Sequence, residues 1–156
     1  MEIKNFLFNE DLVFVKKIFE NKDKLLIFLA NALLEKGAVR DSFVESILTR
    51  EKEHPTGLEL GRINIAIPHT DTEHTKTSSM TVLTLKSPIN FNRMDKPEVE
   101  IPVHIVFMLA IQDPNEYVNF LGKLASQFSN QTFIDQIYES DNSIEIYEKI
   151  KQILEV

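Results

Sequence analysis

The sequence predicts an α/β fold, a three-layer α/β/α sandwich. Two observations predict it. The run Val103–Ala110 is continuously apolar, which is typical of a strand covered on both faces. Helical patterns precede and follow the strand patterns, so helices are available for both faces of a sheet. The 156 residues contain no repeat and no linker rich in Pro, Gly or Ser. We therefore expect a single domain over residues 1–156.

The first third of the chain predicts a strand followed by two helices. A short apolar run at residues 12–15 is the strand. Residues 22–36 carry apolar side chains on one helical face, and Gly37 follows as an expected C-terminal cap. Residues 42–45, Ser-Phe-Val-Glu, have the form of a capping box. The helix they open places residues 50 and 51 in or just beyond its last turn.

The middle of the chain predicts strands, and its end predicts helices. Short apolar patterns at residues 63–67 and 80–85 precede the central strand. Asp113 and Pro114 then supply a cap and a first-turn proline for a helix. We expect this helix to bury Tyr117, Val118, Leu121, Leu124, Ala125 and Phe128. Two more helices are expected at about 133–138 and 144–154.

Composition excludes several classes of protein. The net charge of −7 argues against a nucleic-acid partner, because phosphate backbones require a basic face. The absence of cysteine removes disulfides, thiolate catalysis and cysteine metal sites. No apolar stretch approaches the roughly 20 residues of a membrane span, and no signal-peptide pattern opens the sequence. We expect a cytoplasmic protein.

His69 is the foremost candidate for chemistry. It follows Pro68 at the end of the apolar run 63–67. Proline lacks an N–H and has a fixed φ, so the strand ends there and the next side chain is aimed reproducibly. Catalytic groups in α/β sheets gather at such strand ends. Thr70 and Asp71 are placed to orient the ring through its second nitrogen.

Arg50 is the second candidate. A guanidinium can clamp a phosphoryl group with two parallel hydrogen bonds. The alternative is a structural arginine that interacts with the helix dipole and with Glu51. Thr56 and Gly57 are candidate substrate-binding residues, as backbone donors from a tight turn, although Gly57 can equally be present for a positive φ.

The other three histidines are weaker candidates. We assign His54 no role and expect a structural position for His104. His74 is either a substrate-binding residue near the site or a plain loop histidine. No metal site is expected, since the histidine spacings do not match a helical pair of ligands.

The motifs Arg-Glu (50–51), Pro-Thr-Gly-Leu (55–58) and Ala-Ile-Pro-His (66–69) resemble those of enzyme IIA proteins of the sugar phosphotransferase system, in the mannitol/fructose-type superfamily. The galactitol-type proteins are the most similar branch. The long interval between Arg50 and His69 is galactitol-like, and so are the His, Lys and Ser-Ser at 74–79 and the pair 113–114. We expect residues 59–64 and 70–79 to border the histidine and to select the partner protein.

The resemblance implies a mixed sheet flanked by helices and a phosphotransferase that needs no cofactor. It implies that His69 accepts a phosphoryl group from the carrier HPr and passes it to an enzyme IIB, while a membrane enzyme IIC handles the sugar, here galactitol or a related polyol. Mannitol-type proteins have a second active-site histidine. The nearest position here is Tyr117, so that histidine's role does not carry over. The alternative is a regulatory domain of the same fold that is phosphorylated but controls a transporter or a transcription regulator.

Overall fold

The computed structural model describes residues 5–154, so residues 1–4 and 155–156 of the expected domain lie outside the described residues. Its sheet has the strand order β1-β4-β5-β3-β2. The pairs β1/β4 and β3/β5 are parallel, whereas β4/β5 and β2/β3 are antiparallel, which confirms a mixed sheet. The strands are β1 (Val13–Lys17), β2 (Gly57–Leu58), β3 (Ile65–Ala66), β4 (Ser79–Asn92) and β5 (Glu100–Ala110).

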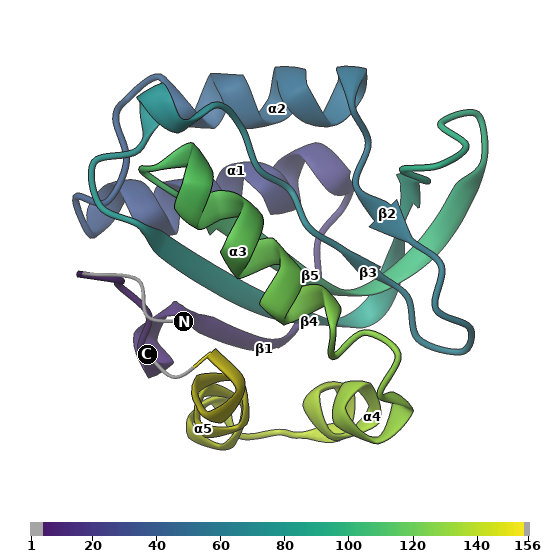
Figure 1. Ribbon diagram of the computed structural model, residues 1–156. Coiled ribbons are helices and arrows are strands. Elements are labelled where there is room, and N and C mark those ends of the chain that lie inside the picture. Colours follow the sequence, from purple (N-terminus) through teal and green to yellow (C-terminus); the bar gives the residue numbers. More distant parts are fainter. Residues whose placement is uncertain (1–4, 155–156) are drawn as a thin grey trace.

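Helices lie on both sides of this sheet (Figure 1), as the three-layer prediction requires. On one side α1 packs against α2, and on the other lie α3, α4 and α5. Short 3-10 turns, η1 (Glu10–Leu12) and η2 (Thr72–His74), precede β1 and β4. The helices are α1 (Lys22–Glu35), α2 (Phe43–Glu53), α3 (Pro114–Ala125), α4 (Gln131–Glu139) and α5 (Ser143–Leu154).

The central strand is β5, as its apolar run predicts. It pairs with β4 on one edge and β3 on the other. Residues 105–110 are all buried, because helices cover both faces of the strand. The strand therefore anchors the core and fixes the positions of its two neighbours.

The strand predictions fail mainly in their lengths. Only two residues of the run 63–67 form ladder pairs, and β2 is not predicted at all. β4 continues to Asn92, well beyond the predicted end at residue 85, because Ile89 to Asn92 pair with the first part of β5. At Gly57 a β-carbon would lie 2.6 Å from the backbone oxygen of Asn92. The close approach therefore explains why residue 57 is glycine. A positive φ does not explain it, because the φ of Gly57 is not positive.

Two helix predictions are wrong in detail. Ser42 has helical backbone angles and makes no capping hydrogen bond from its side chain, so the predicted capping box does not form. In α3, Phe120 and Leu124 pack into the core, which turns Val118 outward with 70% of its surface exposed. Ala125 is exposed for the same reason.

Within residues 5–154, no helix is both long and apolar enough to cross a membrane.

The sheet topology decides where functional side chains can meet. Because β3 and β5 are parallel, the chain leaves both of them at the same edge of the sheet. The backbone N–H of Leu109 donates to the carbonyl oxygen of Pro68 at 3.0 Å, so the two strand ends stay together. After β5 the chain enters α3, where the Asp113 side chain accepts from the N–H of Asn115. His69 and the first turns of α3 are therefore neighbours.

Candidate active site

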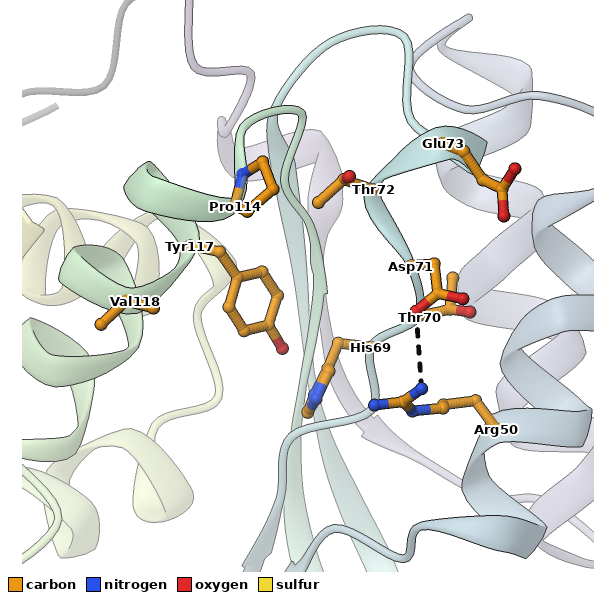
Figure 2. A pocket seen from close by; sticks show the side chains of 9 residues that line it. All are labelled: Arg50, His69, Thr70, Asp71, Thr72, Glu73, Pro114, Tyr117 and Val118. Carbon is orange, nitrogen blue, oxygen red and sulfur yellow. Dashed lines mark hydrogen bonds and ion pairs between the residues drawn. The ribbon is translucent and has the colours of Figure 1, made fainter.

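A pocket of about 530 Å³ opens at this edge of the sheet. Figure 2 shows side chains from α2, the segment after β3, and α3 around it. It brings together His69 and Arg50, the two foremost candidates from the sequence. Its lining residues are Arg50, His69, Thr70, Asp71, Thr72, Glu73, Pro114, Tyr117 and Val118.

The orientation of the His69 ring is set by the backbone. Its Nδ1 lies 2.7 Å from the carbonyl oxygen of Ile67. A carbonyl oxygen can only accept, so Nδ1 carries the proton and Nε2 keeps its lone pair. The prediction that Thr70 or Asp71 orients the ring is wrong, because Thr70 bonds to Ser46 instead.

His69 is held in its neutral form. Burial lowers the pKa of its imidazole, and the nearby Arg50 charge lowers it further, while the bond to Ile67 opposes both. A neutral imidazole with a free Nε2 is a nucleophile at neutral pH.

Arg50 lies in the last turn of α2 and is half-exposed. Its Nη1 is 3.5 Å from Oδ1 of Asp71, a long contact between exposed groups that contributes little stability. Its Nε is buried and has no hydrogen-bond partner within residues 5–154. The guanidinium is therefore available to an anion in the pocket.

Tyr117 faces His69 from the opposite side, on α3. The two ring centroids are 5.0 Å apart, with an interplanar angle of 59°. The Tyr117 hydroxyl is buried, and among the described residues it has no hydrogen-bond partner. Burial raises its pKa well above the usual range for tyrosine.

Thr56 and Gly57 do not line this pocket. Thr56 donates its N–H and its hydroxyl to the two carboxylate oxygens of Glu51, each at 2.8 Å. The expectation that Thr56 offers these donors to a substrate is therefore wrong. Its hydroxyl also accepts the N–H of Ile67 at 3.2 Å, which ties Glu51 to the residue that orients His69. Sequence reasoning missed this role of Glu51, although the residue belongs to the Arg-Glu motif at 50–51.

His74 is also set apart from His69. It lies in η2, with its Nδ1 2.7 Å from the hydroxyl oxygen of Ser42. It lines a neighbouring cavity of about 350 Å³ that shares Arg50, Thr70 and Asp71 with the first pocket.

The remaining histidines lie away from the pocket. His54 is exposed at the end of α2. His104, on β5, accepts the backbone N–H of Asn64 at its Nδ1, 3.1 Å away. The bond made by His104 agrees with the structural position expected for this residue.

Residues 59–64 do not border the pocket, contrary to expectation. They join β2 to β3 and so lie at the opposite end of β3 from His69 (Figure 1). Arg62 in this segment bonds to Asp135 of α4 at 2.6 Å. Only the other predicted segment, residues 70–79, contributes to the pocket, through residues 70–73.

The family model described as "Phosphoenolpyruvate-dependent sugar phosphotransferase system, EIIA 2" matches residues 6–153. The chain belongs to this family. Members of the family are phosphoryl carriers of the sugar phosphotransferase system, so the phosphotransferase predicted from the motifs is confirmed as a family assignment.

Individual relatives of this enzyme IIA component differ in their roles. The galactitol-specific EIIA component of Escherichia coli K12 is 27% identical over 119 residues, which cover 76% of this chain and 79% of the relative. The transcriptional regulator ManR of Bacillus subtilis is 29% identical over 133 residues, which cover 84% of this chain but 19% of the regulator.

Solved structures support the fold. The complex of mannitol enzyme IIA with phosphorylated enzyme IIB from Escherichia coli contains a chain that matches with a TM-score of 0.76 at 18% identity. The match covers 96% of this chain and 98% of the other. At this identity the similarity establishes the shared architecture of a mixed sheet between helices.

Proposed function

We propose that this enzyme IIA component accepts a phosphoryl group on Nε2 of His69 from the phosphohistidine of HPr and passes it to an enzyme IIB. One observation carries the proposal: a neutral imidazole with its Nδ1 held by Ile67 keeps Nε2 free beside the guanidinium of Arg50. Phosphoryl transfer needs positioning and charge neutralisation more than covalent chemistry, and these residues supply both.

The step balances without another reactant. The lone pair of Nε2 attacks the phosphorus of the donor phosphohistidine in line, a new N–P bond forms, and the donor's N–P bond breaks. The donor ring leaves with that electron pair. Because Nδ1 of His69 keeps its proton, the phosphorylated ring gains positive charge, and the Ile67 carbonyl stabilises that charge. Transfer to IIB is the same step in reverse, with a side chain of IIB as the nucleophile.

Arg50 stabilises the charge that spreads over the phosphoryl oxygens during transfer. Before the phosphoryl group arrives, the guanidinium makes only a weak contact with Asp71. The phosphoryl group then replaces Asp71 as the partner, since a dianion attracts the guanidinium more strongly than an exposed carboxylate does. No metal or nucleotide is required for this mechanism.

The proposed IIB is of the galactitol type, and the sugar is galactitol or a related polyol. The galactitol-specific relative and the pattern at residues 74–79 support this choice. Residues 70–73 line the pocket, so a partner that approaches His69 must contact them. The residues at 59–64 no longer support the choice, because they lie at the other end of β3.

Transfer from the phosphorylated protein to purified IIB proteins tests this proposal. We expect transfer to a galactitol-type IIB to be much faster than transfer to a mannitol-type or fructose-type IIB. Equal rates to all three would contradict the proposed specificity. The similarity to ManR favours a second candidate, a phosphorylated regulatory domain. Phosphorylation on His69 without transfer to any IIB would support that candidate over the relay.

A further inference from the structure

Two polar atoms beside His69 are left without partners. Within residues 5–154, three buried side-chain polar atoms lack a hydrogen bond: Nε of Arg50, the Tyr117 hydroxyl and the hydroxyl of Ser79. Ser79 lies in β4 and does not line the pocket, whereas the other two residues do. Buried donors without acceptors are uncommon in folded proteins, so two at one pocket indicate that something else satisfies them.

The side chains that carry these two atoms lie on either side of His69 (Figure 2). Figure 2 shows the His69 ring between Tyr117, which comes from α3, and the guanidinium of Arg50, which comes from α2. The ring of Tyr117 packs against that of His69 with centroids 5.0 Å apart. A group bonded to Nε2 of His69 therefore enters a pocket that both of these donor residues line.

The Tyr117 hydroxyl is suited to donate rather than to ionise. Burial raises the pKa of its phenol, so the hydroxyl keeps its proton at neutral pH. A tyrosine hydroxyl that keeps its proton can donate to one acceptor. A phosphoryl group supplies three strong acceptor oxygens, and a bond from a neutral hydroxyl to a charged oxygen is stronger than one between neutral groups.

We propose that the Tyr117 hydroxyl donates a hydrogen bond to an oxygen of the phosphoryl group on His69, and so holds the phosphorylated state. The inference rests on the proposed function of His69. The hydroxyl keeps its proton throughout, and no covalent bond to it forms or breaks. The bond exists only in the phosphorylated protein, so the hydroxyl has no partner among the described residues before phosphorylation. Tyr117 thus becomes a residue that contacts the transferred group.

The test compares Tyr117→Phe with the unmodified protein, and Tyr138→Phe serves as the matched control. Tyr138 lies in α4, and its ring packs against His104 instead of His69. Each protein is equilibrated with HPr, enzyme I and phosphoenolpyruvate, and the phosphorylated fraction is measured at several ratios of phosphorylated to free HPr. Phosphorus NMR of the phosphohistidine gives a second readout, which a merely structural role would not change.

For Tyr117→Phe we expect unchanged or slightly higher thermal stability before phosphorylation, since the lost hydroxyl has no partner. We also expect the equilibrium constant for phosphorylation to fall by roughly ten- to a hundredfold, the equivalent of one hydrogen bond to a charged oxygen. The phosphorus resonance should shift, and Tyr138→Phe should change neither quantity.

Three results would overturn the inference. The first is an unchanged equilibrium constant and phosphorus resonance in Tyr117→Phe. The second is a marked loss of stability in unphosphorylated Tyr117→Phe, because it would show that the hydroxyl has a structural partner. The third, no phosphate on the unmodified protein, would instead reject the proposed function, and the inference with it.

Discussion

Nδ1 of His69 lies 2.7 Å from the carbonyl oxygen of Ile67, so the backbone two residues earlier decides which ring nitrogen can react. Ile67 is held in turn by Thr56, whose hydroxyl accepts its N–H, and Thr56 is held by the buried carboxylate of Glu51. The orientation of the imidazole therefore depends on α2 as well as on the end of β3. It does not depend on Thr70 and Asp71, which follow His69 and bond to Ser46 and Arg50 instead of to the ring.

Arg50→Ala should leave the fold intact and slow phosphoryl transfer by on the order of 10²–10³, because a preorganised group that stabilises developing charge is lost. Arg50→Lys should recover part of the rate, since lysine keeps the charge but not the paired geometry. Rapid-quench kinetics with phosphorylated HPr measure both rates. Near-native transfer by Arg50→Ala together with a lowered melting temperature would show that this arginine is structural.

Phosphate acceptance should be insensitive to acidification until the pH falls below 6.5, the ordinary pKa of histidine. Burial lowers the pKa of His69, so the reactive neutral form persists to lower pH than it does in the unfolded chain. As the pH falls from 6.5, the pKa in the unfolded chain, to the lower pKa of the folded protein, the unfolded chain binds the proton first. The folded protein therefore loses stability over this pH range. NMR titration of the imidazole measures this pKa directly. Arg50→Ala should raise it, and a pKa at or above 6.5 in the unmodified protein would contradict the prediction.

Glu51 should make the protein less stable as pH rises. Burial raises the pKa of its carboxyl to about 7 from 4.5, while the bonds from Thr56 and the charge of Lys22 oppose the rise. Between these pH values the folded state binds more protons than the unfolded state. The free energy of unfolding should therefore fall by about 3 kcal/mol from about pH 4.5 to about pH 7 and then level off.

Glu51→Gln removes this titration. Urea denaturation of both proteins from about pH 5 to about pH 8 isolates the contribution of Glu51 as the difference between the two pH profiles. The decrease should be absent in the variant. Parallel profiles for the two proteins would mean that Glu51 stays ionised throughout this range.

Gly57→Ala should destabilise the protein by roughly 1–3 kcal/mol, because a β-carbon 2.6 Å from the backbone oxygen of Asn92 forces one of the two segments to move. Gly122→Ala is the matched control. Gly122 lies in α3, where a β-carbon would meet no atom within 4 Å, so alanine there should stabilise by roughly 0.5–1 kcal/mol. Chemical denaturation of both variants measures the change in the free energy of unfolding, which should be a decrease for Gly57→Ala and an increase for Gly122→Ala. Equal changes in the two variants would contradict the close approach at Gly57.

The sequence predicts those helices and strands whose burial is visible as a clear pattern of apolar residues. The run at 103–110 is apolar throughout because β5 is covered on both faces, so its central place is predictable. The second half of β4 is not, since Lys86, Ser87 and Pro88 interrupt the apolar pattern and only pairing with β5 extends the strand. β2 is too short to show an alternation of apolar and polar residues. The predicted capping box does not form because the Ser42 hydroxyl bonds to His74, a residue far along the chain, instead of to the first turn of α2.

The part of the candidate site that motifs and strand ends indicate is predictable from the sequence. Pro68 and the parallel pairing of β3 and β5 bring His69 to the edge of the sheet where α3 begins, and Arg50 meets it there. The partner of Nδ1 is not predictable, because any nearby carbonyl or carboxylate can serve and the backbone path decides between them. The position of residues 59–64 is not predictable either, because it depends on the pairing of β2 with β3. The hairpin between these strands places residues 59–64 away from His69.

Intact mass spectrometry after incubation with enzyme I, HPr and phosphoenolpyruvate shows whether His69 carries a phosphoryl group. We predict the mass increment of one phosphoryl group, labile in acid and stable in alkali as a phosphoramidate is, located on His69 and lost in His69→Ala. Phosphate on His54, His74 or His104 of the unmodified protein, or no increment at all, would show that His69 is not the phosphorylated residue.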